Sequence, residues 1–205
     1  MKFRLTFGLI IAGLLLMFFG GRGLLFSVLP AQEIYNDDCD WTKLHANQRV
    51  HAYLDFVIDP FMETTEDGRS VSQIYTVPDL RVKEDNKIYM THYMGVLVNS
   101  SDYSQYDSLV EASWAWWDME YDELGSQGYI EFDGYLRKMS KKEKGFLRDC
   151  LMDTGYTEEE AEEAIIPYVM MKNQTPLSSL LMFGGGILCL IPGAILCVVF
   201  FVLKK

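Results

Sequence analysis

The chain has 205 residues, of which 49% are hydrophobic, and a formal net charge of −11 at pH 7. All 29 acidic residues lie between residues 30 and 176 with 13 of the 18 Lys and Arg, so this segment carries a net charge of −16. That balance excludes nucleic acid as a partner, because binding phosphates requires an excess of basic side chains. It also disfavours broad attachment to an anionic lipid surface.

The first element is an uncharged apolar stretch of 15 residues, Leu5–Phe19. A helix that crosses a membrane needs about 20 apolar residues, and this one reaches that length if it continues past Arg22 to residue 29. Arg22 would then lie at the interface or face a second helix. A cleaved secretory signal is the alternative, because "MKFR" supplies a basic n-region. The residues around Ala31 lack a good small-x-small cleavage site, which favours an uncleaved anchor.

Residues 49–98 show the two-residue alternation of strands. The alternation predicts a half-buried strand over 49–59 that stops at Pro60, a short strand over 72–78 that ends at Pro78, and a long strand over 87–98. Turns are expected at "TTEDGRS" and "VKEDNK".

The period then changes to three or four residues, which predicts an amphipathic helix that begins near Ser101 or Asp102 and ends at Gly125. The segment "SWAWWDMEYDE" within it holds three tryptophans. Trp114 and Trp117 fall on the apolar side of this helix and are expected to pack against a sheet. Trp116 falls off it, so it is the candidate for an exposed contact with a partner or with the membrane interface.

Residues 128–139 return to strand alternation, and two capping boxes follow, Ser140 with Glu143 and Thr157 with Glu160. The second box is expected to begin a helix that extends through Ile165 to Tyr168, with Pro167 ending or kinking it. A basic island lies in this acidic region and consists of Arg137, Lys138, Lys141, Lys142, Lys144 and Arg148. These cations either neutralise the nearby glutamates or form an interaction surface.

The last element is a run of 27 uncharged residues, Leu177–Leu203, which is long enough to cross a membrane alone. Basic residues next to such spans favour the cytoplasmic side, and here they precede the first span and follow the second. The sequence therefore predicts a multi-pass protein of the cell membrane with both termini cytoplasmic. Its expected parts are a tail (1–4), a first span (5–29), an extracytoplasmic domain (30–176), a second span (177–203) and a tail (204–205).

Small residues recur every four positions in the two spans. They are Gly185, Cys189, Gly193 and Cys197 in the second span and Gly8 and Ala12 in the first. Such stripes let helices approach closely, so these residues are candidates for packing the spans against each other or against another subunit. The alternative is that glycine is simply frequent in membrane helices.

Motifs for catalysis or cofactor binding are missing from the sequence. It contains no GxSxG, no SxxK, no phosphate-binding glycine loop and no zinc-type spacing, so no catalytic, metal or cofactor residue is proposed. His51 and His92 both fall on predicted strands and could be neighbours, which leaves a ligand site as the alternative. A disulfide between Cys39 and Cys150 also stays open.

Three segments carry a resemblance to a known group: "IYTVP" (Ile74–Pro78), "IEFDGYLRKM" (Ile130–Met139) and "GYTEEEAEEAIIPY" (Gly155–Tyr168). With its two flanking spans, the chain resembles uncharacterised bacterial membrane proteins that have an extracytoplasmic α+β domain. That group has no assigned activity, and the resemblance implies no site residues.

The sequence thus predicts an α+β extracytoplasmic domain, an antiparallel sheet with a few helices, flanked by two transmembrane helices. A non-enzymatic interaction or accessory role is expected, with the lipid bilayer and another membrane or envelope protein, or a second copy, as partners. The alternative is a membrane-tethered sensor that binds a small ligand or cation. A deep pocket at His51 or His92 would favour it.

Overall fold

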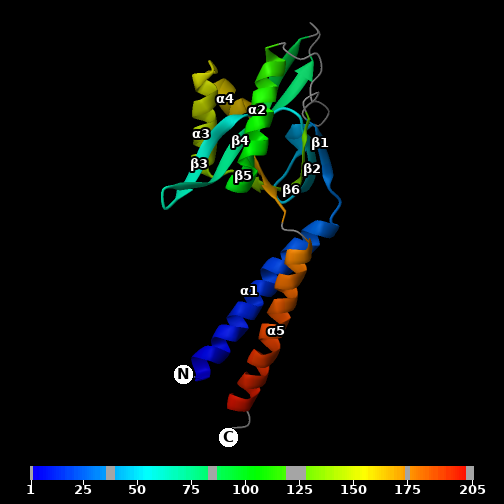
Figure 1. The fold of residues 1–205 in the computed structure, drawn as a ribbon, viewed down its shortest axis with the longest axis vertical. Helices are drawn as coiled ribbons and strands as arrows, with labels where there is room; N and C mark the ends of the chain where they lie inside the picture. Colours follow the sequence, from blue (N-terminus) through cyan, green and yellow to red (C-terminus); the bar gives the residue numbers. More distant parts are fainter. Residues whose placement is uncertain (1, 36–39, 83–86, 119–127, 174–175, 202–205) are drawn as a thin grey trace. The chain divides into compact units, whose positions relative to one another are not determined.

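A computed structural model describes residues 2–35, 40–82, 87–118, 128–173 and 176–201 (Figure 1). The chain divides into two compact units. The first is a helical hairpin formed by Met1–Leu29 and Asn173–Lys205, and the second is the domain Pro30–Lys172.

The domain is an α+β fold built on a seven-stranded sheet with the strand order β1-β2-β6-β7-β5-β4-β3. The strands are β1 (Gln32–Tyr35), β2 (Arg49–Leu54), β3 (Ile58–Glu66), β4 (Arg69–Val82), β5 (Ile88–Asn99), β6 (Ile130–Lys138) and β7 (Ile165–Lys172). The helices are α2 (Tyr103–Trp117), α3 (Lys141–Asp153) and α4 (Glu158–Ala164), with 3-10 turns at Trp41–Lys43 and Ser100–Asp102.

The sheet is mixed, which corrects the antiparallel sheet expected from the sequence. Strand β1 runs parallel to β2, and β7 runs parallel to β5 but antiparallel to β6. The error arises at Ile165, where α4 has ended and a strand begins instead of the expected further helical turn. Ile165 and Val169 of β7 pack into one core, and Ile166 and Met170 pack into the other. A short strand buried on both faces is continuously apolar, so its period does not distinguish it from a buried helix.

Two prolines that were expected to stop strands lie inside them. Pro60 lies in β3, at the edge of the sheet, where a missing N–H donor is tolerated and the register shifts. Pro78 lies in β4 beyond the last residue that pairs with β3, Thr76, so only its β5 side is occupied there. Strand breaks were predicted at both prolines because the sequence does not show where a strand lacks a neighbour, and a proline is tolerated at such a place.

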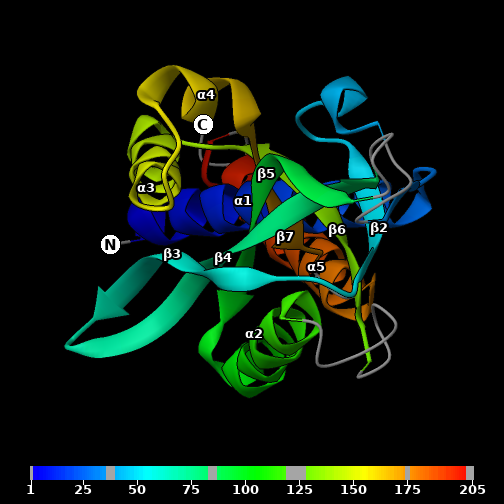
Figure 2. The ribbon, with the colours of Figure 1, turned by 90° about the horizontal axis from the view of Figure 1, so that it is seen from above.

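Helices cover both faces of the sheet (Figure 2). Helix α2 packs on one face, where it joins Ile34, Trp41 and the inward residues of β2, β6 and β7 in one core. Helices α3 and α4 pack on the other face, with Leu147, Leu151 and Ala161 buried against β5 and β7. The two predicted capping boxes that begin α3 and α4 are confirmed.

The hairpin consists of α1 (Lys2–Val28) and α5 (Pro176–Phe201), which lie side by side and antiparallel (Figure 1). Thr6–Val28 and Leu177–Val199 are long and apolar enough to cross a membrane, by length and composition. Gly23 and Phe26 of α1 are buried outside any repeat. The other buried residues of the two helices, among those whose burial is described, are small or polar and recur every seven positions. They are Thr6, Gly13 and Gly20 on α1 and Ser179, Gly186 and Gly193 on α5. A seven-residue repeat keeps one face of a helix on its partner in a left-handed crossing.

The glycines of this repeat bring the two backbones into contact. A Cβ added at Gly13 would lie 2.9 Å from the Gly186 carbonyl oxygen, and one added at Gly186 would lie 2.8 Å from that of Gly13. A Cβ at Gly20 would collide with the backbone nitrogen of Phe183. Glycine is required here because any side chain would push the helices apart.

Of the six small residues expected to pack the helices, some lie at the α1–α5 contact and others lie away from it. Gly193 lies at the α1–α5 contact, where an added Cβ would be 2.9 Å from Ile10 Cγ1. Gly8 and Gly185 would meet no atom within 4 Å, so for this contact the expectation is corrected. Ala12 is exposed and the remaining two, Cys189 and Cys197, are half-buried. Four residues turn a helix about 40° past a full turn, so a four-residue stripe leaves the contact face. Packing of these residues against another subunit stays a prediction.

Candidate functional site

One face of the strands β1, β2 and β6 is left uncovered by helices within the described part of the domain. In β2 and β6, alternate residues such as Ala52 and Phe132 are buried under α2, and the residues between them point to the opposite face. That opposite face is the α3/α4 face, because Tyr135 of β6 pairs with Met171, which packs in the α3/α4 core. Helices α3 and α4 contact β3, β5 and β7 on this face (Figure 2). The part made by β1, β2 and β6 therefore keeps its side chains at the surface.

This surface, called the tyrosine face here, carries aromatic rings beside charged groups. It consists of Glu33, Tyr35, Arg49, His51, Tyr53, Tyr129, Glu131 and Asp133. Cross-strand pairing sets the positions: Tyr35 pairs with Tyr53, and Tyr53 pairs with Glu131. Neighbouring rings across a sheet stabilise each other, so part of this arrangement supports the fold.

The rings form a continuous row. Tyr35 and Tyr53 are stacked, with centroids 5.2 Å apart and planes at 9°. Tyr129 follows at 5.8 Å from Tyr53, and the His51 ring stands edge-on at 4.8 Å from Tyr53. Tyr129 is 59% exposed, so the row ends in a ring that is open to solvent. Rigid tyrosine rings with exposed edges and hydroxyls are typical of protein-binding surfaces.

Carboxylates give the tyrosine face a negative charge. Arg49 binds Asp133 through two hydrogen bonds of 3.3 and 3.1 Å, and His51 Nε2 lies 3.3 Å from Glu131 Oε1. Partial burial, together with the carboxylates of Glu131 and Glu33, raises the pKa of the Tyr53 hydroxyl. Three carboxylates and one arginine therefore share this surface, which suits a cationic partner.

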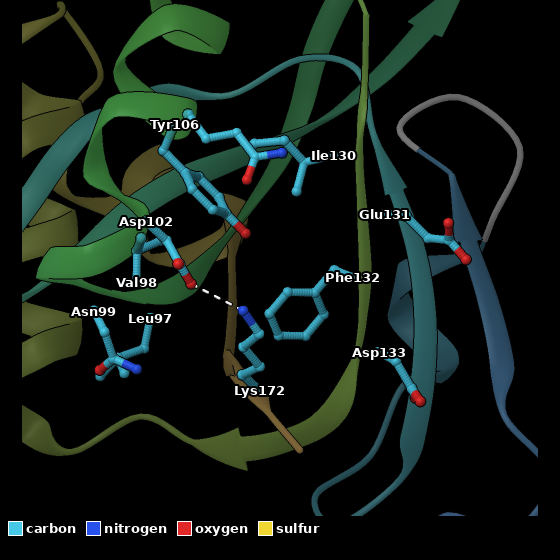
Figure 3. Close-up of a pocket in the computed structure, with 11 residues that line it drawn as sticks. Leu97, Val98, Asn99, Asp102, Tyr106, Ile130, Glu131, Phe132, Asp133 and Lys172 are labelled. Atoms are coloured by element: carbon cyan, nitrogen blue, oxygen red, sulfur yellow. Dashed lines mark hydrogen bonds and ion pairs between the residues drawn. The ribbon is translucent and has the colours of Figure 1, made fainter. Parts of the chain in front are cut away.

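The cavity beside α2 is narrow. It has a volume of about 60 Å³ and lies between α2 and the ends of β5, β6 and β7 (Figure 3). The Lys172 ammonium bridges it with a 2.9 Å bond to Asp102, which lowers the pKa of that carboxyl group. Glu131 and Asp133 leave β6 on the side opposite Phe132, toward the tyrosine face (Figure 3). A neighbouring hollow of about 240 Å³ shares Gln105 and Ile130 with it.

The three histidines lie apart. His51 on β2 and His92 on β5 are separated by β6 and β7, so the expectation that they could be neighbours is wrong. His92 lines an open depression of about 420 Å³ beside α4, and His45 binds Gln48 on a turn. Among the described residues, no group of three His, Cys, Asp or Glu is placed to hold a metal ion. Cys39 lies outside the described residues, and Cys150 is half-buried with a free thiol.

The basic island is largely neutralised within the fold. Arg137 donates two hydrogen bonds to Glu143, of 3.0 and 2.7 Å, Lys144 binds Glu162, and Arg148 lies 3.2 Å from Glu158. The other three lysines, Lys138, Lys141 and Lys142, are exposed and form no ion pair with described residues. Lys142 lies over the ring of Phe146 at 5.5 Å. The island's role as an interaction surface therefore rests on these three lysines and stays a prediction.

The tryptophans are arranged differently from the expectation. Trp116 is half-buried, with its ring edge-on to the buried Phe56 at 5.7 Å, whereas Trp114 and Trp117 are each 37% exposed. The buried side of α2 continues from Tyr106, Leu109 and Val110 to Ser113. Ser113 Oγ accepts a 2.9 Å bond from the Val57 amide, so this side of α2 faces the β2–β3 connection.

The tyrosine face was not found from the sequence. A half-buried strand was predicted over 49–59, but β1 lay in a segment without a predicted element, and the pairing of β2 with β6 was not predicted. The alternation of Arg49, His51 and Tyr53 with buried residues was the available signal. Four aromatic or histidine rings on one face become visible only when the strand order is known.

A profile of the family described as "Domain of unknown function (DUF8577)" matches residues 1–204. Neither a curated protein nor a solved structure matches the chain.

Proposed function

Because the chain belongs to the DUF8577 family, whose function is unknown, we propose a function from its own residues. The chain is a multi-pass protein of a bacterial cell membrane with both termini in the cytoplasm. Its α+β domain lies outside the cytoplasm and acts as a non-enzymatic accessory module. Through the tyrosine face, the domain binds another membrane or envelope protein that offers a basic surface.

The hairpin supports the membrane part of the proposal. Leu14, Phe18 and Leu25 on α1 and Leu181 and Leu188 on α5 are among many large apolar side chains that point away from the helix contact and are exposed. Glycines at the contact bring the two backbones close together, which is typical of helices that pack in lipid. The basic residues Lys2, Arg4, Lys204 and Lys205 support cytoplasmic ends.

The uncovered face of β1, β2 and β6 is the observation that carries the interaction part. It presents a row of tyrosine rings next to Glu33, Glu131 and Asp133 in a domain of net charge −16. Two copies of such a surface would repel each other, and like charges across an interface are unfavourable. A partner with exposed Arg or Lys is the complementary occupant, because it would pair with the carboxylates and pack along the rings.

Affinity purification tests the interaction. The full-length protein, tagged at its C-terminus, would be purified from native membranes in mild detergent beside two variants. Tyr129→Arg replaces the exposed end of the ring row by a cation, and Phe146→Arg makes the same change at an exposed site on α3. We expect one stoichiometric partner with the wild type and with Phe146→Arg, and loss of that partner with Tyr129→Arg. A protein that elutes alone, or a partner retained by both variants, would overturn the interaction.

Reporter fusions test the membrane arrangement separately. A C-terminal green fluorescent protein is expected to fluoresce, and a C-terminal alkaline phosphatase is expected to be inactive, because both would lie in the cytoplasm. Phosphatase fused after residue 172, at the end of the domain, is expected to be active. The opposite activities would contradict the orientation, and recovery of the chain in the soluble fraction would contradict the spans.

A further inference from the structure

The depression beside α4 is a second place where functional groups converge. It has a volume of about 420 Å³, is open to solvent, and lies between the first half of β5 and α4. The residues of its lining that matter here are Tyr89, Thr91, His92, Tyr156, Glu160 and Glu163. Its size is within the range of small-molecule sites, which span about 300–1,000 Å³.

A β-bulge shapes the wall that β5 contributes. Asp79 pairs with His92 and Leu80 pairs with Met90, so Thr91 is an extra residue on β5 that has no partner in this register. A bulge re-aims the side chains around it. Here Thr91 and His92, which are consecutive, both reach the depression and the same carboxylate of Asp79.

The buried carboxylate of Asp79 orients the histidine. Asp79 is only 2% exposed, and its Oδ1 lies 2.8 Å from Nε of Arg81. Its Oδ2 accepts a 3.2 Å bond from Thr91 Oγ1 and lies 3.3 Å from His92 Nδ1. His92 Nδ1 also lies 3.2 Å from Thr91 Oγ1. A carboxylate oxygen only accepts, so the tautomer that donates from Nδ1 to Asp79 keeps Nε2 as an acceptor, and this is the tautomer used in the proposal.

The opposite wall adds negative charge. Glu160 and Glu163 come from α4, one turn apart. The amide and hydroxyl of Thr157 donate to Glu160 Oε2, at 2.9 and 2.7 Å, and these bonds lower the pKa of Glu160. Glu160 is therefore ionised and held in place. Tyr156, whose hydroxyl is 2.9 Å from that of Tyr93, also lines the depression.

We propose that this depression binds a small organic cation that carries a primary amine. Its walls offer two carboxylates, the Nε2 acceptor of His92 and two tyrosine rings, and no Lys or Arg is among the described residues that line it. An ammonium group would satisfy the acceptors, and the rings would contact its charge or its alkyl chain. A metal ion fits less well, because three ligands do not converge among the described residues. The site is independent of the partner proposed for the tyrosine face.

Calorimetric titration of the full-length protein in detergent tests the site. The probe is putrescine, a four-carbon diamine, and butane-1,4-diol of the same length is the uncharged control. Saturable binding of putrescine and none of the diol is expected. Failure of putrescine to bind, equal binding of the diol, or displacement of putrescine by equimolar zinc ion would overturn the proposal.

Two glutamine variants of α4 separate the site from the general acidity of the domain. Glu163→Gln removes a charge that lines the depression, and Glu159→Gln removes one from the same helix outside it. The expected loss of putrescine affinity is about fivefold or more for Glu163→Gln and less than about twofold for Glu159→Gln. Equal losses would overturn the proposal. His92→Leu, which has no hydrogen-bond acceptor in its side chain, is expected to behave as Glu163→Gln.

Discussion

The hairpin and the α+β domain achieve close packing by opposite means. In the domain, the cores are filled by large side chains such as Trp41, Phe56 and Leu147, each at most 1% exposed. In the hairpin, Gly13, Gly20 and Gly186 bring the two backbones into contact, side chains such as Met17 and Leu190 pack against these glycines, and many other large apolar side chains are exposed. The domain is thus packed by large buried side chains, whereas the two helices of the hairpin approach each other at glycines.

The packing of each unit matches the solvent proposed for it, which is water for the domain and lipid for the hairpin. In water, burial of apolar surface contributes about 25 cal/mol per Å², so large side chains in the core stabilise the domain. In lipid, that driving force between helices is missing, and close van der Waals contact between backbones replaces it. The comparison predicts that the domain is sensitive to loss of volume and the hairpin to gain of volume.

Leu147→Ala is expected to have the largest effect, because it deletes a fully buried side chain of α3. Such deletions leave a cavity and lower the free energy of unfolding by about 2–5 kcal/mol. The neighbouring change Phe146→Ala, at a side chain that is 41% exposed, is expected to cost less than about 1 kcal/mol. Urea unfolding of the full-length protein in detergent, followed by tryptophan fluorescence, measures both, because all four tryptophans lie in the domain. Equal losses would contradict the assignment of the core.

Gly20→Leu makes the converse test in the hairpin. Its side chain would collide with the backbone of Phe183, which has no rotamer to change, so a loss at the upper end of the about 1–3 kcal/mol typical of overpacking is expected. Gly185→Leu is the control, because a Cβ there meets no atom within 4 Å. Titration with sodium dodecyl sulfate, followed by circular dichroism, measures the stability of the helix pair. An unchanged transition for Gly20→Leu, or an equal shift for Gly185→Leu, would break the comparison.

Local sequence patterns predicted the individual helices and strands better than they predicted which strands pair with each other. The capping boxes, the strand at 130–138 and the two long apolar helices were visible because each depends on residues close in the chain. The strand β7, the pairing of β5 with β7 and the continuation of strands through Pro60 and Pro78 were missed. These depend on contacts between distant segments. Such contacts decide whether a neighbouring strand would use the N–H that a proline lacks, and whether an apolar run becomes a strand. For the same reason the tyrosine face and the bulge at Thr91 could not be predicted.

Glu143→Gln tests a charged contact that belongs to neither packing pattern. Hydrogen bonds from Arg137, and then from Ser140, outweigh burial and lower the pKa of Glu143 from its ordinary value of 4.5 to about 2. Since the pKa is lower in the folded state, the carboxylate stabilises the fold above pH 4.5, and this contribution is lost as the pH falls toward 2. Replacement by Gln is expected to cost about 2 kcal/mol at pH 7.

The pH dependence distinguishes this contact from simple packing. The difference in unfolding free energy between wild type and Glu143→Gln should shrink as the pH is lowered from 4.5 to 2, because the wild-type carboxylate becomes protonated. Glu111→Gln, an exposed change on α2, is the control and should show no comparable difference. A difference that is constant across this range would show that shape, not charge, holds Glu143.

Trp114→Phe is expected to have the smallest effect, and it tests the corrected orientation of α2. Trp114 is 37% exposed, and its indole Nε1 donates a 3.0 Å hydrogen bond to Asp59 Oδ2 on β3. Phenylalanine keeps most of the contact area but loses the donor, so a cost of about 1 kcal/mol is expected from the hydrogen bond. Trp116→Phe, which keeps an aromatic ring against Phe56 and removes no hydrogen bond that the described residues form, is the matched control.

Asp59→Ala distinguishes the two orientations of α2. If Trp114 packed in the core as its spacing suggested, Trp114→Phe would cost more stability than Trp116→Phe both in the wild type and in Asp59→Ala. In the arrangement seen here, Asp59→Ala removes the difference between the two variants, because the indole donor then has no carboxylate to bind.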